Sequence, residues 1–373
     1  MGVSAKAIRL PDATRWPPYG LAHVRRLTDA TGMVEHAVGG VPNPTEGYTL
    51  DDNARALVTV LRYHHIARDA ESLELAFRYL SFIVYCQLPD GWFHNDVGYD
   101  RRFLDERAPE DPVGRALWAL AEAAAIAELE ALRVAAVRTL ARSLAWAERF
   151  EGLRPAAYTL IGLGHALQAP PDRLPRELAD RAAALVQRLA QRLVSAFAQT
   201  SSGSWQWFEP RLTYCNACLP HALVAAWQAT GRVEFLEVAG VTADFLWRHL
   251  WDGRVWHVVG NRGWWERGRP PARFDQQPVD AGATAELSAA LFAATGDPRH
   301  LERACAALEW FYGRNAAGTP MVDATTGGCR DGLGADGVNP NQGAESTLAH
   351  LMARMAVERA LEQAGSGSRL AMA

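Results

Sequence analysis

Acidic residues that could do chemistry recur through the sequence, several of them beside aromatic residues. Breaking a glycosidic bond takes two carboxyl groups, one protonated to serve the leaving group and one ionised to act on water or on the anomeric carbon. The candidates are Asp51, Asp52, Glu110, Asp111, Glu209, Asp275, Asp280, Asp323, Asp331 and Glu345. We therefore expect a carboxylate pair that acts on a sugar, and the elements that carry these acids decide which two can meet.

Tryptophan is abundant, with 13 residues, and its placement points the same way. An indole ring offers a flat apolar surface to the C–H face of a pyranose, while its N–H can reach a hydroxyl. The aromatic residues expected in long loops are Trp92, Trp205, Trp207, Trp256, Trp264, Trp265, Tyr99, Phe208 and Phe274. We expect this set to line a sugar-binding funnel, whereas Trp118 and Trp310 occur at helical spacing and are expected in the core.

Polar side chains suited to sugar hydroxyls lie near the same acids. We expect the substrate-binding residues to be Asp51, Asn53, Trp92, Tyr99, Arg102, Asp111, Arg115, Trp205, Trp207, Tyr214, Asn216, His221, Trp264, Gln276, Gln277, Asp280, Asp331 and Asn341. Arg102 could also bind a phosphate or a uronate carboxylate bidentately, although an ion pair with Asp105 or Glu106 explains it as well. No cofactor and no metal ion is expected, because the run DATTGGCRDGLGADG lacks the spacing of a calcium loop.

The composition of the 373 residues, 49% hydrophobic and 21% charged, is that of a soluble globular protein. A net charge of -4 and the absence of a run of basic residues argue against a nucleic-acid partner. No window of about 18 apolar residues predicts a membrane span. The first twenty residues lack the pattern of a secretory signal, so we expect the cytoplasm.

The five cysteines are Cys86, Cys215, Cys218, Cys305 and Cys329. An odd number scattered through a long chain favours reduced thiols over a disulfide framework. Cys215 and Cys218 have the spacing of half a redox or zinc site, but no second half is present in the sequence. We expect both to be ordinary buried thiols.

Apolar residues recur at helical spacing almost throughout, so we expect an all-α protein. The expected helices are 18–30, 51–67, 71–87, 110–128, 131–149, 154–168, 175–199, 214–229, 233–249, 278–295, 298–315 and 343–364. Long segments rich in Gly, Trp and Asp follow the helices that end near positions 87, 199, 249 and 315, and short links join most others. In an up-and-down series alternate connections lie at opposite ends, which places the long loops on one face. Six helical hairpins would then close a ring: a single (α/α)6 toroid domain over 1–373, with short irregular segments at 1–17 and 365–373.

The helices expected to line the ring are those whose first turns face the funnel. They begin near Thr49, Pro109, Leu153, Thr213, Asp275 and Asn341. Capping of free backbone N–H groups explains most of the acids at these positions. It does not explain the doubled acids Asp51-Asp52 and Glu110-Asp111, because one carboxylate is enough for a cap.

This architecture resembles the six-hairpin glycosidase-like superfamily over nearly the whole chain. The toroids of that superfamily bind sugars at the end where the inner helices begin, so the resemblance implies a carbohydrate substrate at the long loops. The stretches TLDDNARA, YDRRFLDE, EDPVGRALWAL and NPNQGAESTLAHL look like those of uncharacterised bacterial proteins often described alongside glycosyltransferases. That second likeness implies no particular activity.

Ring closure selects among the acids, because it makes the first and last inner helices neighbours. Asp52 and Glu345 would then face one another, at a distance compatible with the roughly 6.5 to 9.5 Å of an inverting pair. The layout resembles that of six-hairpin cellulases, with an early acidic pair and a late glutamate. Glu209 and Asp275 are the rival catalytic acids, since each lies at a loop-to-helix junction where desolvation by aromatic rings suits a general acid. Either could instead be a helix cap or the partner of an arginine.

We predict a glycoside hydrolase that acts on an oligosaccharide, with the oligomeric state open, and three alternatives remain. A sugar isomerase or epimerase on the same toroid would use histidine bases, for which His94, His221 and His257 are available. A non-catalytic glycan-binding protein would need only the tryptophans. A terpene-cyclase-like toroid is suggested by QLPDGW and DDNAR, but Arg55 stands where the third Asp of that metal motif would fall.

Overall fold

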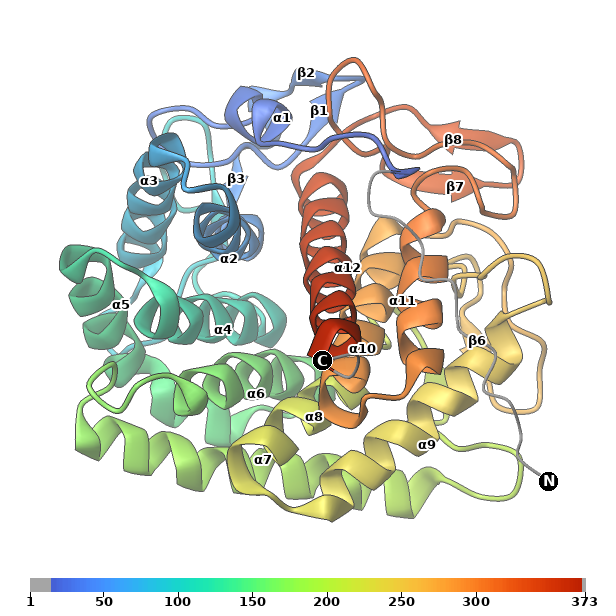
Figure 1. The fold of residues 1–373 in the computed structure, drawn as a ribbon. Helices are drawn as coiled ribbons and strands as arrows, with labels where there is room; N and C mark the ends of the chain where they lie inside the picture. Colours follow the sequence, from blue (N-terminus) through green and yellow to red (C-terminus); the bar gives the residue numbers. More distant parts are fainter. Residues whose placement is uncertain (1–14, 371–373) are drawn as a thin grey trace.

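The computed structural model describes residues 15–370. Its core is a ring of six helices, each packed against the next one along the chain, and the last packed against the first (Figure 1). These inner helices are α2 (Leu50–Ala67), α4 (Glu110–Ile126), α6 (Leu153–Gln168), α8 (Cys218–Thr230), α10 (Pro278–Thr295) and α12 (Ala344–Leu370). The predicted all-α (α/α)6 toroid is therefore confirmed.

A second layer of helices surrounds the ring. It consists of α3 (Ala70–Cys86), α5 (Glu130–Ser143), α7 (Arg176–Thr200), α9 (Val233–Leu250), α11 (Pro298–Glu309) and the short α1 (Ala22–Arg26). The outer helices are amphipathic: α7 buries Leu178, Ala182, Leu185 and Leu189, at spacings of three and four residues. Inner helices such as α4 are buried almost throughout, because neighbours cover them on every side.

Some predicted boundaries were wrong for local reasons. The helix expected at 18–30 is only Ala22–Arg26, because Pro17 and Pro18 precede it and Thr28 pairs with Met33 in an antiparallel bridge. The helix expected at 131–149 ends at Ser143 and continues as the 3₁₀ segment Leu144–Arg149, and the one expected at 298–315 ends at Glu309. At the C-terminus α12 continues to Leu370, where an irregular segment was expected from 365. The remainder of the two predicted irregular ends lies largely outside the described residues.

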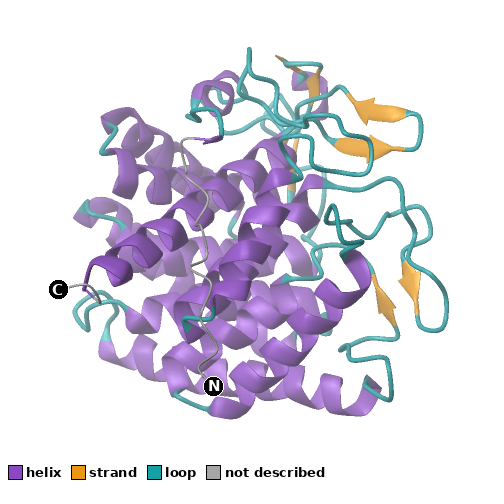
Figure 2. Ribbon diagram, turned by 45° about the vertical axis from the view of Figure 1, so that its right-hand side comes forward, coloured by secondary structure: helices purple, strands orange, loops and turns teal. Residues whose placement is uncertain are grey.

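The long connections gather on one face, as predicted (Figure 2). Four two-stranded sheets brace them: β1 (Ala37–Val38) with β2 (Val41–Pro42), β3 (Tyr48–Thr49) with β4 (Asp96–Val97), β5 (Arg211–Leu212) with β6 (Trp265–Glu266), and β7 (Gly332–Gly334) with β8 (Gly337–Asn339). Two of these sheets join loops that are distant in sequence. They therefore fix the loop face above the N-termini of the inner helices.

Glycines let the inner helices approach closely. A Cβ built on Gly162 of α6 would lie 2.6 Å from the Cα of Trp118 on α4, and one on Gly114 would lie 2.6 Å from the Cα of Pro155. Contacts this short are available only to glycine, so these positions hold the ring tight.

We expect Gly162→Ala to lower the free energy of unfolding by roughly 1 to 3 kcal/mol, because the added methyl must displace the backbone of α4. The matched control is Gly240→Ala on the outer helix α9, where a Cβ meets no atom within 4 Å. That change should be neutral or stabilise by up to about 1 kcal/mol through helix propensity. Urea unfolding measures both, and equal effects at the two positions would contradict the close approach of α4 and α6.

Candidate functional site

The N-termini of α2, α4 and α12 bring a set of charged side chains together on the axis of the ring. The Thr49 hydroxyl oxygen accepts a hydrogen bond from the Asp52 N–H at 3.2 Å, so α2 begins at Leu50 and both acids fall in its first turn. Arg55 follows one turn later, and Glu345 lies in the first turn of the neighbouring α12. Ring closure thus joins residues from opposite ends of the chain.

Arg55 is the centre of this network. Its Nη2 lies 2.6 Å from Asp51 Oδ2, and its Nη1 lies 2.5 Å from Glu345 Oε2 and 3.6 Å from Asp52 Oδ1. Arg115 of α4 binds the other oxygen of Asp51, with Nε 2.6 Å from Oδ1. Asp52 and Glu345, the pair expected to meet, therefore contact the same guanidinium nitrogen, and Arg55 itself lies between them.

The surroundings of these acids shift their pKa values in opposite directions. Burial raises the pKa of Asp52 well above its ordinary value, and the nearby carboxylates of Asp51 and Glu35 reinforce the shift. Burial also disfavours ionisation of Glu345, but Arg55 and Arg115 outweigh it and hold the pKa of Glu345 below its usual range. The Glu345 side chain is 39% exposed and that of Asp52 is 6% exposed. The carboxyl group whose pKa is lowered thus faces solvent, and the one whose pKa is raised lies behind it.

Glu35 is an acid of this site that the sequence analysis missed. Its carbonyl oxygen accepts a hydrogen bond from the Ala344 N–H at 2.9 Å, which places it beside the start of α12. Burial raises the pKa of Glu35, and the carboxylates of Asp96 and Asp51 add to the shift, while its side chain remains 33% exposed. The segment before α2 lies on the same face as the four long loops identified from the sequence. That position was the signal that could have pointed to Glu35.

Directly below the Arg55 network lies a further group of polar side chains, carried by α6, α10 and the turn before α8. Arg115 Nη2 donates a hydrogen bond to the Tyr158 hydroxyl at 2.8 Å. A hydrogen bond from Cys218 lowers the pKa of Cys215 to about 6, and Arg115 assists against the effect of burial. Burial raises the pKa of Asp280 to about 7, with a contribution from the charge of Cys215. Cys215 and Cys218 are buried thiols, as expected, but Cys215 has an unusually acidic one.

The start of α8 explains why Cys215 lies in this group. The helix was expected from 214 but begins at Cys218, because Cys215 has a φ of 46°, which a helix does not allow. The Asn216 side chain accepts from the Thr213 N–H at 3.0 Å and donates to the Thr213 carbonyl oxygen at 2.7 Å. Asp280 Oδ1 accepts from the Asn216 N–H at 3.1 Å. Asn216 and Asp280 therefore shape the turn before α8.

The axis of the ring is narrow below Glu345. The cavity there has a volume of about 30 Å³, enough for about two water molecules. Its lining includes Arg55, Tyr158, Cys215, His221 and Glu345. Burial lowers the pKa of His221 to about 3, so its imidazole is neutral. A sugar ring does not fit in this space.

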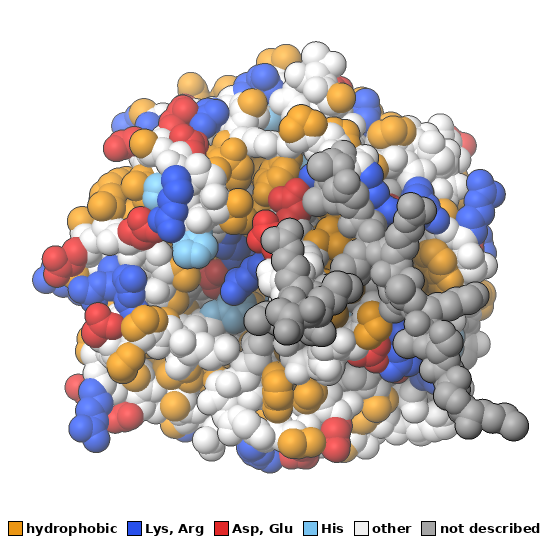
Figure 3. Space-filling view, in the orientation of Figure 1, with side chains coloured by type: hydrophobic (Ala, Val, Ile, Leu, Met, Phe, Trp, Pro, Cys, Tyr) orange, Lys and Arg blue, Asp and Glu red, His pale blue; other side chains and the backbone are white. Residues whose placement is uncertain are grey.

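The ring continues downward into a third group of charged side chains. Arg62 of α2 pairs with Glu122 of α4 at 2.7 Å and with Glu286 of α10 at 2.9 Å. His165 Nδ1 lies 3.1 Å from Glu122. On the face shown in Figure 3, a hollow near the centre contains basic, acidic and histidine side chains. Polar groups therefore line the axis from the loop face toward the opposite face.

The loop tryptophans do not line a funnel, contrary to the prediction. Trp205, Trp207, Trp256 and Trp265 are buried within the loop layer. The Nε1–H of Trp205 donates to the Glu209 carbonyl oxygen at 2.9 Å, and Trp92 donates likewise to Ala108 at 2.9 Å. These rings form the packed core of the loops. Of the predicted aromatic set, Trp92, Trp264 and Phe274 are partly exposed, and Tyr99 is exposed and stacks on Tyr48. The ring of Trp264 lies 6.4 Å, between centroids, from that of Tyr214, which is also partly exposed.

Several other predicted residues support the scaffold. Asn53 is fully buried, and its side chain bonds to the main chain of Met33 and Thr49. Gln276 is also fully buried, and its Oε1 accepts from Trp310 Nε1 at 2.8 Å. The Asn341 side chain accepts from the Gly39 N–H at 3.0 Å. These groups hold loops in place, and of the three only Asn341 is partly exposed.

The rival acids lie outside the Arg55 network. Glu209 pairs with Arg154 at 3.0 Å, and Asp275 pairs with Arg262 at 2.8 Å. Asp111 accepts a hydrogen bond from the Tyr214 hydroxyl. Arg102 is exposed and lies 3.4 Å from Asp100, rather than beside Asp105 or Glu106 as expected.

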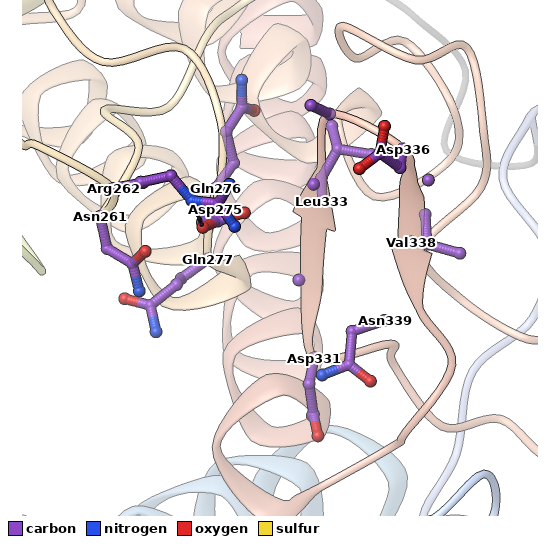
Figure 4. A pocket seen from close by; sticks show the side chains of 14 residues that line it. Asn261, Arg262, Asp275, Gln276, Gln277, Asp331, Leu333, Asp336, Val338 and Asn339 are labelled. Carbon is purple, nitrogen blue, oxygen red and sulfur yellow. Dashed lines mark hydrogen bonds and ion pairs between the residues drawn. The ribbon is translucent and has the colours of Figure 1, made fainter.

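A larger pocket opens beside the network on the loop face (Figure 4). Its volume is about 490 Å³, within the range of small-molecule sites. Gln277 and Asp331 of the predicted set line it, together with Asp275. Asp331 Oδ1 also accepts from the Gly343 N–H at 2.8 Å, so it borders both the pocket and the start of α12.

The described residues show neither a metal site nor a membrane-spanning helix. They contain no group of three or more His, Cys, Asp or Glu side chains placed to hold a metal ion. In the same part of the chain no helix has the length and apolar character that crossing a bilayer requires. The chemistry available at the ring axis is that of carboxyl groups, arginines, a neutral imidazole and an acidic thiol.

Comparison with known proteins places the fold. No protein-family model matches the chain, and no curated protein matches its sequence. Among solved structures, a D-mannose isomerase is 14% identical, with 91% of this chain and 95% of that chain covered and a TM-score of 0.69. A cellobiose 2-epimerase from Bacillus thermoamylovorans is 12% identical, with 92% and 96% covered and a TM-score of 0.70. An α-1,6-mannanase from Salegentibacter sp. is 12% identical, with 91% and 96% covered and a TM-score of 0.59. The fold is thus that of the six-hairpin glycosidase-like (α/α)6 toroids.

The raised pKa of Asp280 predicts a pH dependence of stability. Its pKa is about 7 in the folded protein and about 3.8 when unperturbed, so between these values the folded state holds a proton that the unfolded state has lost. Stability from this group is therefore complete at low pH and decreases as the pH rises toward 7. Asp280→Asn stays neutral and keeps the acceptor for Asn216, so its unfolding free energy should fall less than that of the wild type between about pH 5 and pH 8.

Urea unfolding at the two pH values measures this difference. Asp180→Asn, at an exposed position on α7, is the control and should retain the slope of the wild type. An Asp280→Asn protein with that same slope would show that Asp280 is ionised in the folded state.

Proposed function

We propose that this protein hydrolyses a glycosidic bond of an oligosaccharide bound over Glu345 at the loop face. The observation that supports this most is that neighbouring acids at the start of α2 and α12 have pKa values shifted in opposite directions. Arg55 and Arg115 lower the pKa of Glu345, whose side chain is partly exposed, whereas burial raises the pKa values of Glu35 and Asp52. A glycosidase needs one ionised and one protonated carboxyl group.

We assign the base to Glu345 and the acid to Glu35. Glu345 would accept a proton from a water molecule as the water oxygen bonds to the anomeric carbon. Glu35 would donate its proton to the leaving oxygen as the glycosidic bond breaks, and solvent would then reprotonate it. Asp52 was the predicted partner of Glu345, but its side chain is nearly covered and its Oδ2 accepts from the Thr49 hydroxyl at 3.1 Å. It suits the position of a supporting acid that tunes Glu345 and Arg55.

Arg55 and Arg115 have a defined task in this proposal. They keep Glu345 ionised and hold Asp51 fixed through both of its oxygens. Glu209 and Asp275, each paired with its own arginine, would take no part in bond cleavage. We further propose the cytoplasm as the working compartment, since all five cysteines are free thiols.

Epimerisation or isomerisation of a sugar is the second candidate. His221 favours it, because a neutral imidazole lines the axial cavity together with Glu345 and would take up a proton from a sugar at the loop face through the water that this cavity admits. The solved structures of similar fold whose names are isomerase or epimerase also suit this reading. The two reactions differ in their products, since hydrolysis shortens the sugar and epimerisation preserves its length.

Incubation with gluco-, manno- and galacto-oligosaccharides should yield shorter sugars from at least one series. Glu345→Gln and Glu35→Gln should each lower kcat roughly a hundredfold to ten-thousandfold, because each removes one member of the acid and base pair. Glu106→Gln, at an exposed position of the same loop face, should retain full activity.

Running the reaction in D2O distinguishes the two candidates. Deuterium bound to a sugar carbon, with no change in chain length, would show epimerisation and not hydrolysis. His221→Asn should then abolish the exchange. Turnover that survives both glutamate substitutions would contradict the assignment of Glu345 and Glu35.

A further inference from the structure

The large pocket beside the Arg55 network has the size and position of a second binding site. It lies between the connection that precedes α10 and the β7–β8 hairpin (Figure 4). Its lining includes Asp275, Gln276 and Gln277, the residues directly before α10. With a volume of about 490 Å³ it exceeds the axial cavity more than tenfold and falls in the range of small-molecule sites.

The pocket lining is polar and carries more acid than base. Amide side chains come from Asn261, Gln277 and Asn339, and carboxyl groups come from Asp275, Asp331 and Asp336. Arg262 is the one basic residue among the lining residues, and its Nε already pairs with Asp275. Such a surface offers many hydrogen-bond partners to hydroxyl groups and repels an anionic ligand.

Glycines form one wall of the pocket. The β7 strand contributes Gly332 and Gly334, so main chain faces the ligand space there. A Cβ built on Gly334 would lie 3.5 Å from Asp275 Oδ1 on the opposite wall. Gly334 has no positive φ, so a larger residue meets no φ strain there, although its Cβ would lie 3.3 Å from the Gly337 carbonyl oxygen, which must shift slightly.

The pocket adjoins the proposed reaction site through Asp331. This residue lines the pocket, and its carboxylate holds the Gly343 N–H two positions before Glu345. A chain of sugars bound over Glu345 would therefore extend past Asp331 into the pocket.

We infer that the pocket between Asn261, Gln277 and the β7–β8 hairpin is a second sugar subsite, which holds further units of a neutral oligosaccharide and excludes uronate-bearing chains. The continuity with the reaction site rests on the proposed function, but the binding itself does not. The ligand class follows from the three carboxyl groups and the amides of Asn261, Gln277 and Asn339 against a single, already paired arginine.

Isothermal titration of the full chain with cellobiose, cellohexaose, mannobiose and mannohexaose tests the inference. One hexasaccharide should bind more tightly than its disaccharide, and Gly334→Leu should weaken that binding about tenfold or more while leaving the disaccharide unchanged. Gln277→Ala removes one hydrogen-bonding side chain of the pocket without adding bulk and should also weaken binding of the hexasaccharide. Because Gln277 lies outside the β7–β8 hairpin, this result would show that the effect of Gly334→Leu is not caused by a disturbed hairpin. Gly240→Leu on α9, where added atoms meet open space, should bind like the wild type.

The outcomes separate this inference from the proposed function. Length-dependent binding that Gly334→Leu removes supports the subsite even if the protein hydrolyses nothing. Equal binding of short and long sugars, no binding of any neutral sugar, or tighter binding of an oligogalacturonate than of the neutral hexasaccharides would each overturn it.

Discussion

The ion pairs of Arg55 are the interactions on which the site and the closure of the ring both depend. Its buried guanidinium pairs with acids of its own helix and with Glu345 of α12, and Asp51 passes the connection on to Arg115 of α4. A charge buried without its partners costs several kcal/mol, so every member of such a network must be in place. The first inner helix is therefore complete only when the last one has docked.

The same network shapes the proposed reaction site. The close approach of the inner helices at glycines leaves about 30 Å³ on the axis, which is less than a sugar ring needs. Above this cavity the two arginines lower the pKa of Glu345, while burial and the surrounding acids raise the pKa of Glu35. In the proposed hydrolysis, this difference separates the base from the acid.

Much of the architecture could be predicted from the sequence, because it follows from helical periodicity and from the alternation of long and short connections. Those signals placed five of the six inner helix starts to within one residue, with α8 as the exception, and ring closure brought Asp52 and Glu345 to one nitrogen of Arg55. Composition could not show which face of a loop aromatic points inward. Trp205 and Trp207 were therefore predicted at a binding surface, whereas they fill the core of the loop layer. Glu35 could not be found by periodicity, since its place beside α12 depends on a main-chain hydrogen bond to Ala344.

The central claim is that an ionised and a protonated carboxyl group coexist at the floor of the loop face. An NMR titration of the protein with 13C-labelled glutamate side chains, assigned with Glu345→Gln and Glu35→Gln, observes both groups directly. We expect the pKa of Glu345 to lie below the ordinary glutamate value and the pKa of Glu35 to lie above it. Two glutamates that titrate together at the ordinary value would contradict it.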